Sequence, residues 1–403
     1  MKKLALAAAC AALSVSSVCA PWLLAAPAAA QGAAVAAAVT PEQVVRHYAA
    51  LVQAGYDDTL AGALELQAAV RAFTASPSQA GLQAARQAWL AARESYGQTE
   101  AFRFYGGPID DDNGPEGRLN AWPMDESYVD SVKGDEKAGL INDRQVAITK
   151  KNLSALNERD GEENIATGWH AIEFMLWGQD LSETGPGNRS FEDFVDGKRA
   201  NADRRRQYLQ VVTELLVDDL RSLTRAWAPP AAKQKANYRA KFERAGTESL
   251  RRIFVGLGSL SRGELAGERL EVALASQDQE DEHSCFSDNT HRDAVTNAKG
   301  IQNVWTGRYV RRDGRVLQGP ALRDLVAAKN AALAERTSAQ IAASVAAAEA
   351  IQAPFDREII GGADAPGRQR VQRTIDSLTQ QSKDLVEAAG AIGITRLTLV
   401  NPE

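Results

Sequence analysis

Apolar residues at helical spacing run through almost the whole chain and limit it to an all-α fold. At residues 40–52, Thr40 is placed to cap a helix, Pro41 to fill its first turn and Gln43 to close a capping box. The apolar residues that follow recur three and four positions apart, as on one helix face. Alternating strand patterns are scarce, and residues 395–400 (TRLTLV) are the one short candidate.

Further segments rich in Ala, Leu, Arg and Gln predict a series of helices. They lie at about 58–75, 78–104, 136–158, 204–227, 233–260, 263–284, 288–306, 320–352 and 368–391.

The length of the chain predicts two helical bodies, because 403 residues exceed what one hydrophobic core usually serves. A loose echo between residues 64–73 and 346–356, each followed by a long helix, suggests an internal duplication. We therefore expect two halves resembling four-helix bundles, residues 31–230 and 231–403, divided near the prolines at 229–230.

The first 30 residues predict a secretory signal peptide. Lys2 and Lys3 precede an apolar run over residues 4–24, and small residues follow up to a cleavage site near Ala30. No second apolar run is long enough to predict a membrane span. We therefore expect a periplasmic or cell-envelope protein released by a cleavable signal peptide.

The charge balance argues against nucleic acid and anionic membranes as partners. The chain carries 46 basic and 52 acidic residues, and loss of the leader removes two lysines and no acids. Cys10 and Cys19 would leave with the leader, so Cys285 is the one cysteine of the mature chain. The sequence therefore predicts no disulfide framework.

Residues 168–180 (GWHAIEFMLWGQD) carry His170 and Glu173 three positions apart in an otherwise apolar helix. Burying either group without a partner costs several kcal/mol, about 2–7 for a neutral polar group. Neutral imidazole and carboxylate are suitable ligands for zinc or iron. The alternative is a hydrogen-bonded structural pair inside a helical bundle.

A second polar cluster lies at residues 279–293 and includes Glu280, His283, Cys285 and His291. On the predicted helix His291 shares a stripe with apolar residues, so we expect it to face inward. Cys285 is open to three roles: metal ligand, redox-sensitive thiol or small buried residue. The alternative for the whole cluster is a solvated acidic loop.

These segments resemble the imelysin family, whose members are also called iron-regulated protein A or insulin-cleaving membrane protease. Residues 168–180 are similar to the family's Gly-x-His-x-x-Glu block. Residues 92–110, 118–130 and 263–301 also resemble family blocks, so the resemblance spans most of the mature chain.

The resemblance implies a secreted all-α protein of two helical bundles with a candidate site at Gly168, His170 and Glu173. It also implies a role in bacterial iron handling, with envelope iron-transport components as partners. The family has been classed among metallopeptidases as well, because of its His-x-x-Glu motif.

Chemistry favours metal binding over peptidase activity. A zinc peptidase of the His-Glu-x-x-His type needs two histidines one turn apart, and neither that motif nor its inverted form is present, since position 174 is Phe. The prediction is an exported protein that binds a metal ion, iron rather than zinc, through His170 and Glu173. Weaker candidate ligands are Glu100, Glu280, His283 and His291. A metallopeptidase is the first alternative, and a metal-free structural or ligand-binding protein is the second.

Overall fold

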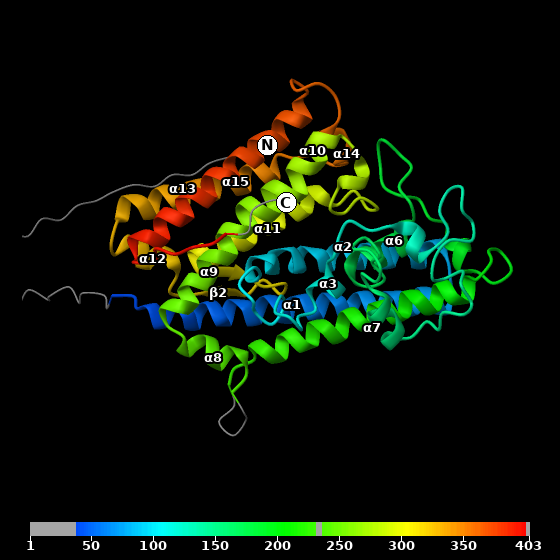
Figure 1. Cartoon of the computed structure of the whole chain (residues 1–403), viewed down its shortest axis with the longest axis horizontal. Helices are drawn as coiled ribbons and strands as arrows, with labels where there is room; N and C mark the ends of the chain where they lie inside the picture. The colour runs from blue at the N-terminus through cyan, green and yellow to red at the C-terminus, as the bar shows by residue number, and fades with distance from the viewer. Residues whose placement is uncertain (1–37, 231–235, 400–403) are drawn as a thin grey trace, which may run out of the picture. The chain divides into compact units, whose positions relative to one another are not determined.

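The computed structural model describes residues 38–230 and 236–399 (Figure 1). The predicted signal peptide and the segment just after the predicted boundary at 230 lie outside the described residues. The elements are α1 (Pro41–Ala75), α2 (Gln79–Thr99), η1 (Glu100–Phe102), α3 (Glu116–Leu119), α4 (Glu126–Val129), α5 (Lys150–Leu156), α6 (Gly168–Trp177), η2 (Phe191–Phe194), α7 (Ala202–Trp227), α8 (Tyr238–Arg244), α9 (Thr247–Ser259), η3 (Leu260–Glu271), α10 (Val272–Ser276), η4 (Gln279–Asp281), α11 (Thr290–Thr306), β1 (Arg308–Val310), β2 (Val316–Gln318), α12 (Leu322–Ala327), α13 (Ala331–Glu349), α14 (Asp356–Ile359) and α15 (Pro366–Ala391).

Helices dominate the described residues, which confirms the predicted all-α class. α1 begins as expected: the Thr40 hydroxyl accepts a hydrogen bond from the amide of Gln43, and the Gln43 side chain accepts one from the amide of Thr40. The predicted helices at 40–52 and 58–75 are one continuous helix, α1. None of the helices that the structure describes is both long and apolar enough to cross a lipid bilayer.

Long helices pack side by side in two groups (Figure 1). α1 contacts α2 and α7, and α15 contacts α9, η3 and α13. α11 contacts both α13 and α2, so it joins the later helices to the earlier ones. One continuous cluster of buried apolar side chains runs through both groups. The predicted division into two duplicated bundles stays a prediction.

Local expectations were wrong in several places, three of which follow. Most of the predicted helix at 136–158 is turns and irregular chain, and only α5 is helical there. Residues 395–399 form no strand, whereas a two-stranded antiparallel hairpin, β1–β2, lies at residues 308–318. The helix that contains η3, a π-helical segment, ends at Ser276 rather than near 284.

Polar cross-links hold the irregular region between α3 and α6. Asp130, which ends α4, is fully buried and accepts hydrogen bonds from Arg205 at 2.8 Å to each carboxylate oxygen. Arg189 adds a third bond of 2.8 Å. Burial alone would raise the pKa of Asp130, but the two guanidinium groups hold it at about 2.

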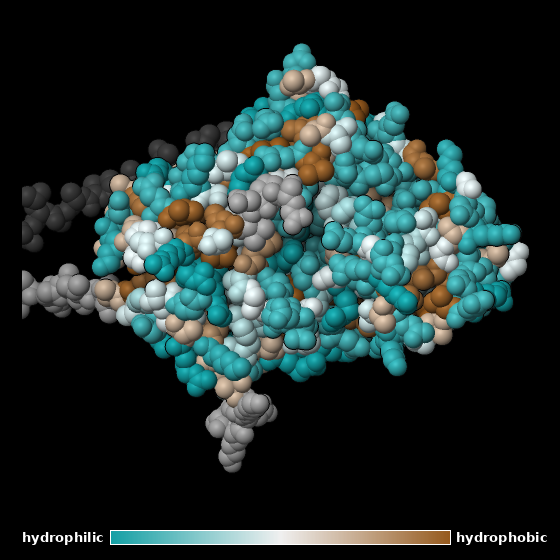
Figure 2. Space-filling model, in the orientation of Figure 1, coloured by the Kyte–Doolittle hydropathy of each residue, from teal (hydrophilic) through white to brown (hydrophobic). Residues whose placement is uncertain are grey.

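The face of the molecule in Figure 2 is mostly hydrophilic, as expected of helices that bury their apolar sides.

The Asp130 ion pairs predict an acid-dependent loss of stability. Because the folded-state pKa is depressed, the stabilisation of about 2 kcal/mol is present above the unfolded-state pKa and is lost as pH falls toward 2. The free energy of unfolding of Asp130→Asn should therefore approach that of the parent between about pH 5 and about pH 3. Urea titrations of both proteins measure this difference, and a constant gap over that range would contradict the assignment.

Candidate metal centre

The start of α6 requires glycine. Gly168 has a φ of +90°, and a β-carbon there would lie 2.5 Å from the carbonyl oxygen of Leu119. The preceding Thr167 hydroxyl donates to the carbonyl oxygen of Arg118 at 3.0 Å. The first turn of α6 therefore sits directly on the end of α3, and Gly168 acts through backbone geometry.

Substitution of Gly168 tests this geometry. Gly168→Ala combines backbone strain with a clash against Leu119, so we expect it to lower the free energy of unfolding by about 3 kcal/mol or more. Gly197 is the matched control, because its φ is +80° but nothing lies within 4 Å of an added β-carbon. Gly197→Ala should lose only about 1 kcal/mol in the same urea titration. Equal losses would contradict the close-contact argument.

His170 and Glu173 face each other one turn apart on α6, and both are buried. The Nδ1 atom of His170 lies 2.9 Å from Oε2 of Glu173. The other oxygen, Oε1, accepts hydrogen bonds from Ser287, at 2.9 Å from its amide and 2.6 Å from its hydroxyl. Glu173 therefore ties α6 to the loop that precedes α11.

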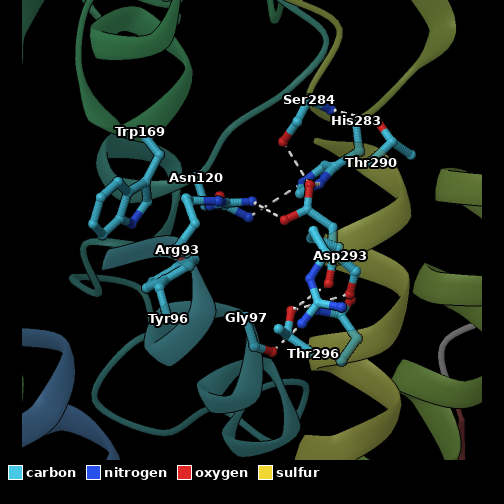
Figure 3. Close-up of polar contacts among 12 residues, drawn as sticks. Arg93, Tyr96, Gly97, Asn120, Trp169, His283, Ser284, Thr290, Asp293 and Thr296 are labelled. Atoms are coloured by element: carbon cyan, nitrogen blue, oxygen red, sulfur yellow. Dashed lines mark hydrogen bonds and ion pairs between the residues drawn. The ribbon is translucent and has the colours of Figure 1, made fainter. Parts of the chain in front are cut away.

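His283 lies on that loop and forms a second histidine–carboxylate pair (Figure 3). Its Nδ1 atom is 2.8 Å from Oδ2 of Asp293, and Oδ1 of Asp293 accepts from Arg93 at 2.9 Å. Arg93 also donates to Oδ1 of Asn120 at 2.6 Å, and the Ser284 hydroxyl donates to Asp293 at 2.5 Å. This network fixes the imidazole of His283 from three chain segments.

The two histidine pairs meet. The ring centroids of His170 and His283 are 4.8 Å apart with an interplanar angle of 74°. The Nε2 atom of His170 is buried without a hydrogen-bond partner among the described residues. The Nε2 atom of His283 has only a 3.5 Å contact with the side-chain nitrogen Nδ2 of Asn120. Each imidazole thus uses Nδ1 for a carboxylate and leaves Nε2 available, which is the usual arrangement of a metal-ligating histidine.

Electrostatics keep both imidazoles neutral. Burial lowers the pKa of His170 well below its ordinary value and lowers that of His283 to about 3. Burial raises the pKa of Glu173 to about 8. Burial alone would also raise the pKa of Asp293, but Arg93 and His283 bring it well below its usual range. Neutral imidazoles retain the lone pair that a metal ion needs.

The other predicted ligands have different partners. Glu100 is buried but ion-paired with Arg103 and Arg269, each at 2.6 Å. Glu280 is exposed and lines a surface groove. His291 was expected to face inward, but it is only partly buried, because it lies in the first turn of α11 where the helix meets a groove of about 630 Å³. Among the described residues, no hydrogen bond or ion pair links these three side chains to His170 or Glu173.

The sequence analysis did not identify Asp293 or Arg93 as partners of the candidate site. No local pattern could pair Asp293 with Arg93, because 200 residues separate them in the sequence. Sequence reasoning also missed a cluster of buried acids, in which carboxylate oxygens of Asp180, Asp288 and Asp356 all lie within 4.8 Å of one another. Burial and neighbouring acids raise the pKa of Asp180 to about 6 and that of Asp288 to about 8.

Cys285 is buried beside this loop. Burial, followed by nearby carboxylates such as Glu173, raises the pKa of its thiol well above the ordinary value. Because the thiolate is the reactive form, alkylation by iodoacetamide at neutral pH should be roughly 100-fold slower in the folded protein than in urea. Peptide mass spectrometry measures the two rates, and similar rates would favour the redox-sensitive role.

Comparisons with known proteins relate the sequence and the fold of this chain to one family. A family model described as imelysin matches residues 52–385. Iron-regulated protein A of Synechococcus elongatus is 26% identical over 317 residues, which cover 77% of this chain and 75% of that protein. The crystal structure of a protein named as an iron-regulated protein A precursor from Parabacteroides distasonis has a TM-score of 0.67 at 19% identity. The match covers 89% of this chain and 97% of that chain, and at this identity it shows a shared fold.

Proposed function

Because this chain belongs to the imelysin family, we propose that it binds a metal ion, iron in the cell, between His170 and His283 as part of iron acquisition in the cell envelope. The observation that carries the proposal is the pair of adjacent buried imidazoles whose Nε2 atoms lack strong hydrogen-bond partners. A buried polar atom without a partner costs about 1–3 kcal/mol, and a bound cation would remove that cost.

The chain supplies the second shell of such a site as well. Glu173 and Asp293 lie at hydrogen-bond distance from Nδ1 of each imidazole. With a cation bound at Nε2, both carboxyl groups would be ionised and would accept from Nδ1, which fixes the tautomer and raises the basicity of Nε2. Ser287 and Arg93 in turn hold the two carboxylates. The prediction that Glu173 is itself a ligand stays a prediction.

Iron is proposed as the cargo from the relatives and from the donor atoms. The relatives named above are called iron-regulated, and that name is the link to iron. Imidazole with carboxylate support suits iron, but zinc and copper bind nitrogen ligands more tightly than ferrous iron does. Selectivity in the cell would therefore depend on metal supply, and binding tests must offer iron and zinc separately.

A metallopeptidase remains the alternative, and no observation favours it. His170 and His283 are only 1% and 2% exposed, so a polypeptide substrate would reach them only after the loop at 282–288 moved. A metal ion needs a smaller opening. Export to the envelope is proposed from the leader sequence, and sequencing the N-terminus of the mature protein tests it by finding residue 31 at or near the start.

Metal binding is tested on the full chain, expressed with its leader and purified without chelators. Elemental mass spectrometry and anaerobic titration with ferrous iron should give about one iron ion per chain. His170→Ala and His283→Ala should each lose at least about 100-fold in affinity, and Glu173→Gln about 10–100-fold.

His47→Ala is the matched control, because His47 is hydrogen-bonded to the carbonyl oxygen of Gly307 and lies outside the centre. It should bind iron like the parent. Absence of both iron and zinc from every protein, with His170→Ala merely less stable, would mean that the histidine pairs are structural. Stoichiometric zinc that resists exchange for iron would direct the work to peptidase assays.

A further inference from the structure

Four buried acids lie together on one side of the loop at residues 282–288. Asp180 follows α6, Glu282 and Asp288 flank the loop, and Asp356 is the first residue of α14. All four are at most 4% exposed. Carboxylate oxygens of the three aspartates lie within 4.8 Å of one another, and the carboxyl group of Glu282 lies beside that of Asp356.

The acids have no compensating charge among the described residues. Among residues 38–230 and 236–399, no hydrogen-bond partner reaches either carboxylate oxygen of Glu282, Asp288 or Asp356, or one oxygen of Asp180, and all these atoms are buried. No arginine or lysine within 38–230 or 236–399 forms an ion pair with any of the four, whereas the buried Asp130 has two arginines. Uncompensated buried carboxylates are unfavourable, so the unpartnered oxygens point to a cation or to bound protons.

The donor set fits calcium best. All the available ligands are carboxylate oxygens, which bind hard divalent cations. The oxygens of the three aspartates lie close enough together, within 4.8 Å of one another, to share one cation. Ca²⁺ accepts irregular sets of oxygen ligands at about 2.4 Å, whereas Mg²⁺ requires near-ideal octahedral geometry at about 2.1 Å. Asp180 and Asp356 also line a groove of about 510 Å³, which gives an ion and its water ligands a route from solvent.

We propose that Asp180, Glu282, Asp288 and Asp356 form a Ca²⁺ site that ties the loop at 282–288 to the end of α6 and the start of α14. The ion would neutralise the four acids and hold the loop at both ends. The same loop carries His283 and Ser287, whose partners lie on α11 and α6. This calcium site does not depend on iron binding at the histidines.

The test begins with full-chain protein freed of metal by EDTA. Calorimetric titration with CaCl₂ should show one site per chain, and the melting temperature should rise by about 3–5 °C at a hundredfold excess over Kd. Hydrogen exchange should slow at least about tenfold in peptides covering 281–289 and remain unchanged in those covering 104–117.

Substitutions locate the site. Asp288→Asn and Glu282→Gln should abolish the calcium effect, yet be at least as stable as the parent without calcium, because each removes a repelling carboxylate. Asn also tolerates the φ of +55° at position 288. Asp112→Asn, in an exposed acidic loop, is the control and should respond to calcium like the parent. His170→Ala should respond as well, which separates this proposal from iron binding.

Several results would overturn the calcium site. Absence of both heat and a melting shift with CaCl₂ would mean that the acids share protons instead. A calcium response that persists in both Asp288→Asn and Glu282→Gln would place the ion elsewhere. Tighter binding of MgCl₂ or MnCl₂ than of CaCl₂ would overturn the choice of cation.

Discussion

The buried ion pair between Arg93 and Asp293 is the contact on which the candidate centre depends. It joins α2 to α11 across 200 residues of sequence, and both side chains are 2% exposed. Asp293 uses its second oxygen to hold His283, and Arg93 uses its second nitrogen to hold Asn120. A buried pair of this kind adds little net stability, but loss of one partner leaves a charge that costs about 3–5 kcal/mol. The main effect of the ion pair is therefore on geometry, because the same contact holds α2 against α11 and fixes the orientation of His283.

The buried acids fall into two groups, those with a guanidinium partner and those without one. The first group is structural, and the second contains the candidate binding groups. Asp130, Glu100 and Asp293 each have one or two guanidinium groups within hydrogen-bonding distance, so they are ionised and fixed. In the part of the chain that the structure describes, Glu173 and the four clustered acids, which include Asp288, have none. Compensated acids cross-link the fold, whereas acids without a positive partner retain the capacity to bind a proton or a cation.

Much of this structure could be predicted from local sequence patterns, but the contacts between segments far apart in the sequence could not. Capping and helical periodicity correctly predicted α1, and the spacing of His170 and Glu173 correctly suggested a contact on one helix turn. The helix predicted at 136–158 is mostly absent. Arg204 on α7 donates hydrogen bonds to four carbonyl groups of this segment, and these bonds stabilise an irregular conformation in place of a helix. The hairpin at 308–318 carried an Asp-Gly turn signal that was overlooked. The partners of His283 could not be found from periodicity, since Arg93 and Asn120 come from distant segments.

The loop at 282–288 links the two candidate sites physically. Its backbone is short, and adjacent residues point to different partners: Glu282 lies beside Asp356, while His283 contacts Asp293 and His170. At the other end, Ser287 bonds Glu173 and Asp288 joins the acid cluster. An ion that restrains Glu282 and Asp288 also lowers the entropy cost of placing His283 and Ser287. The two proposed sites therefore share one loop but use separate groups, the two imidazoles on one side and the four carboxyl groups on the other.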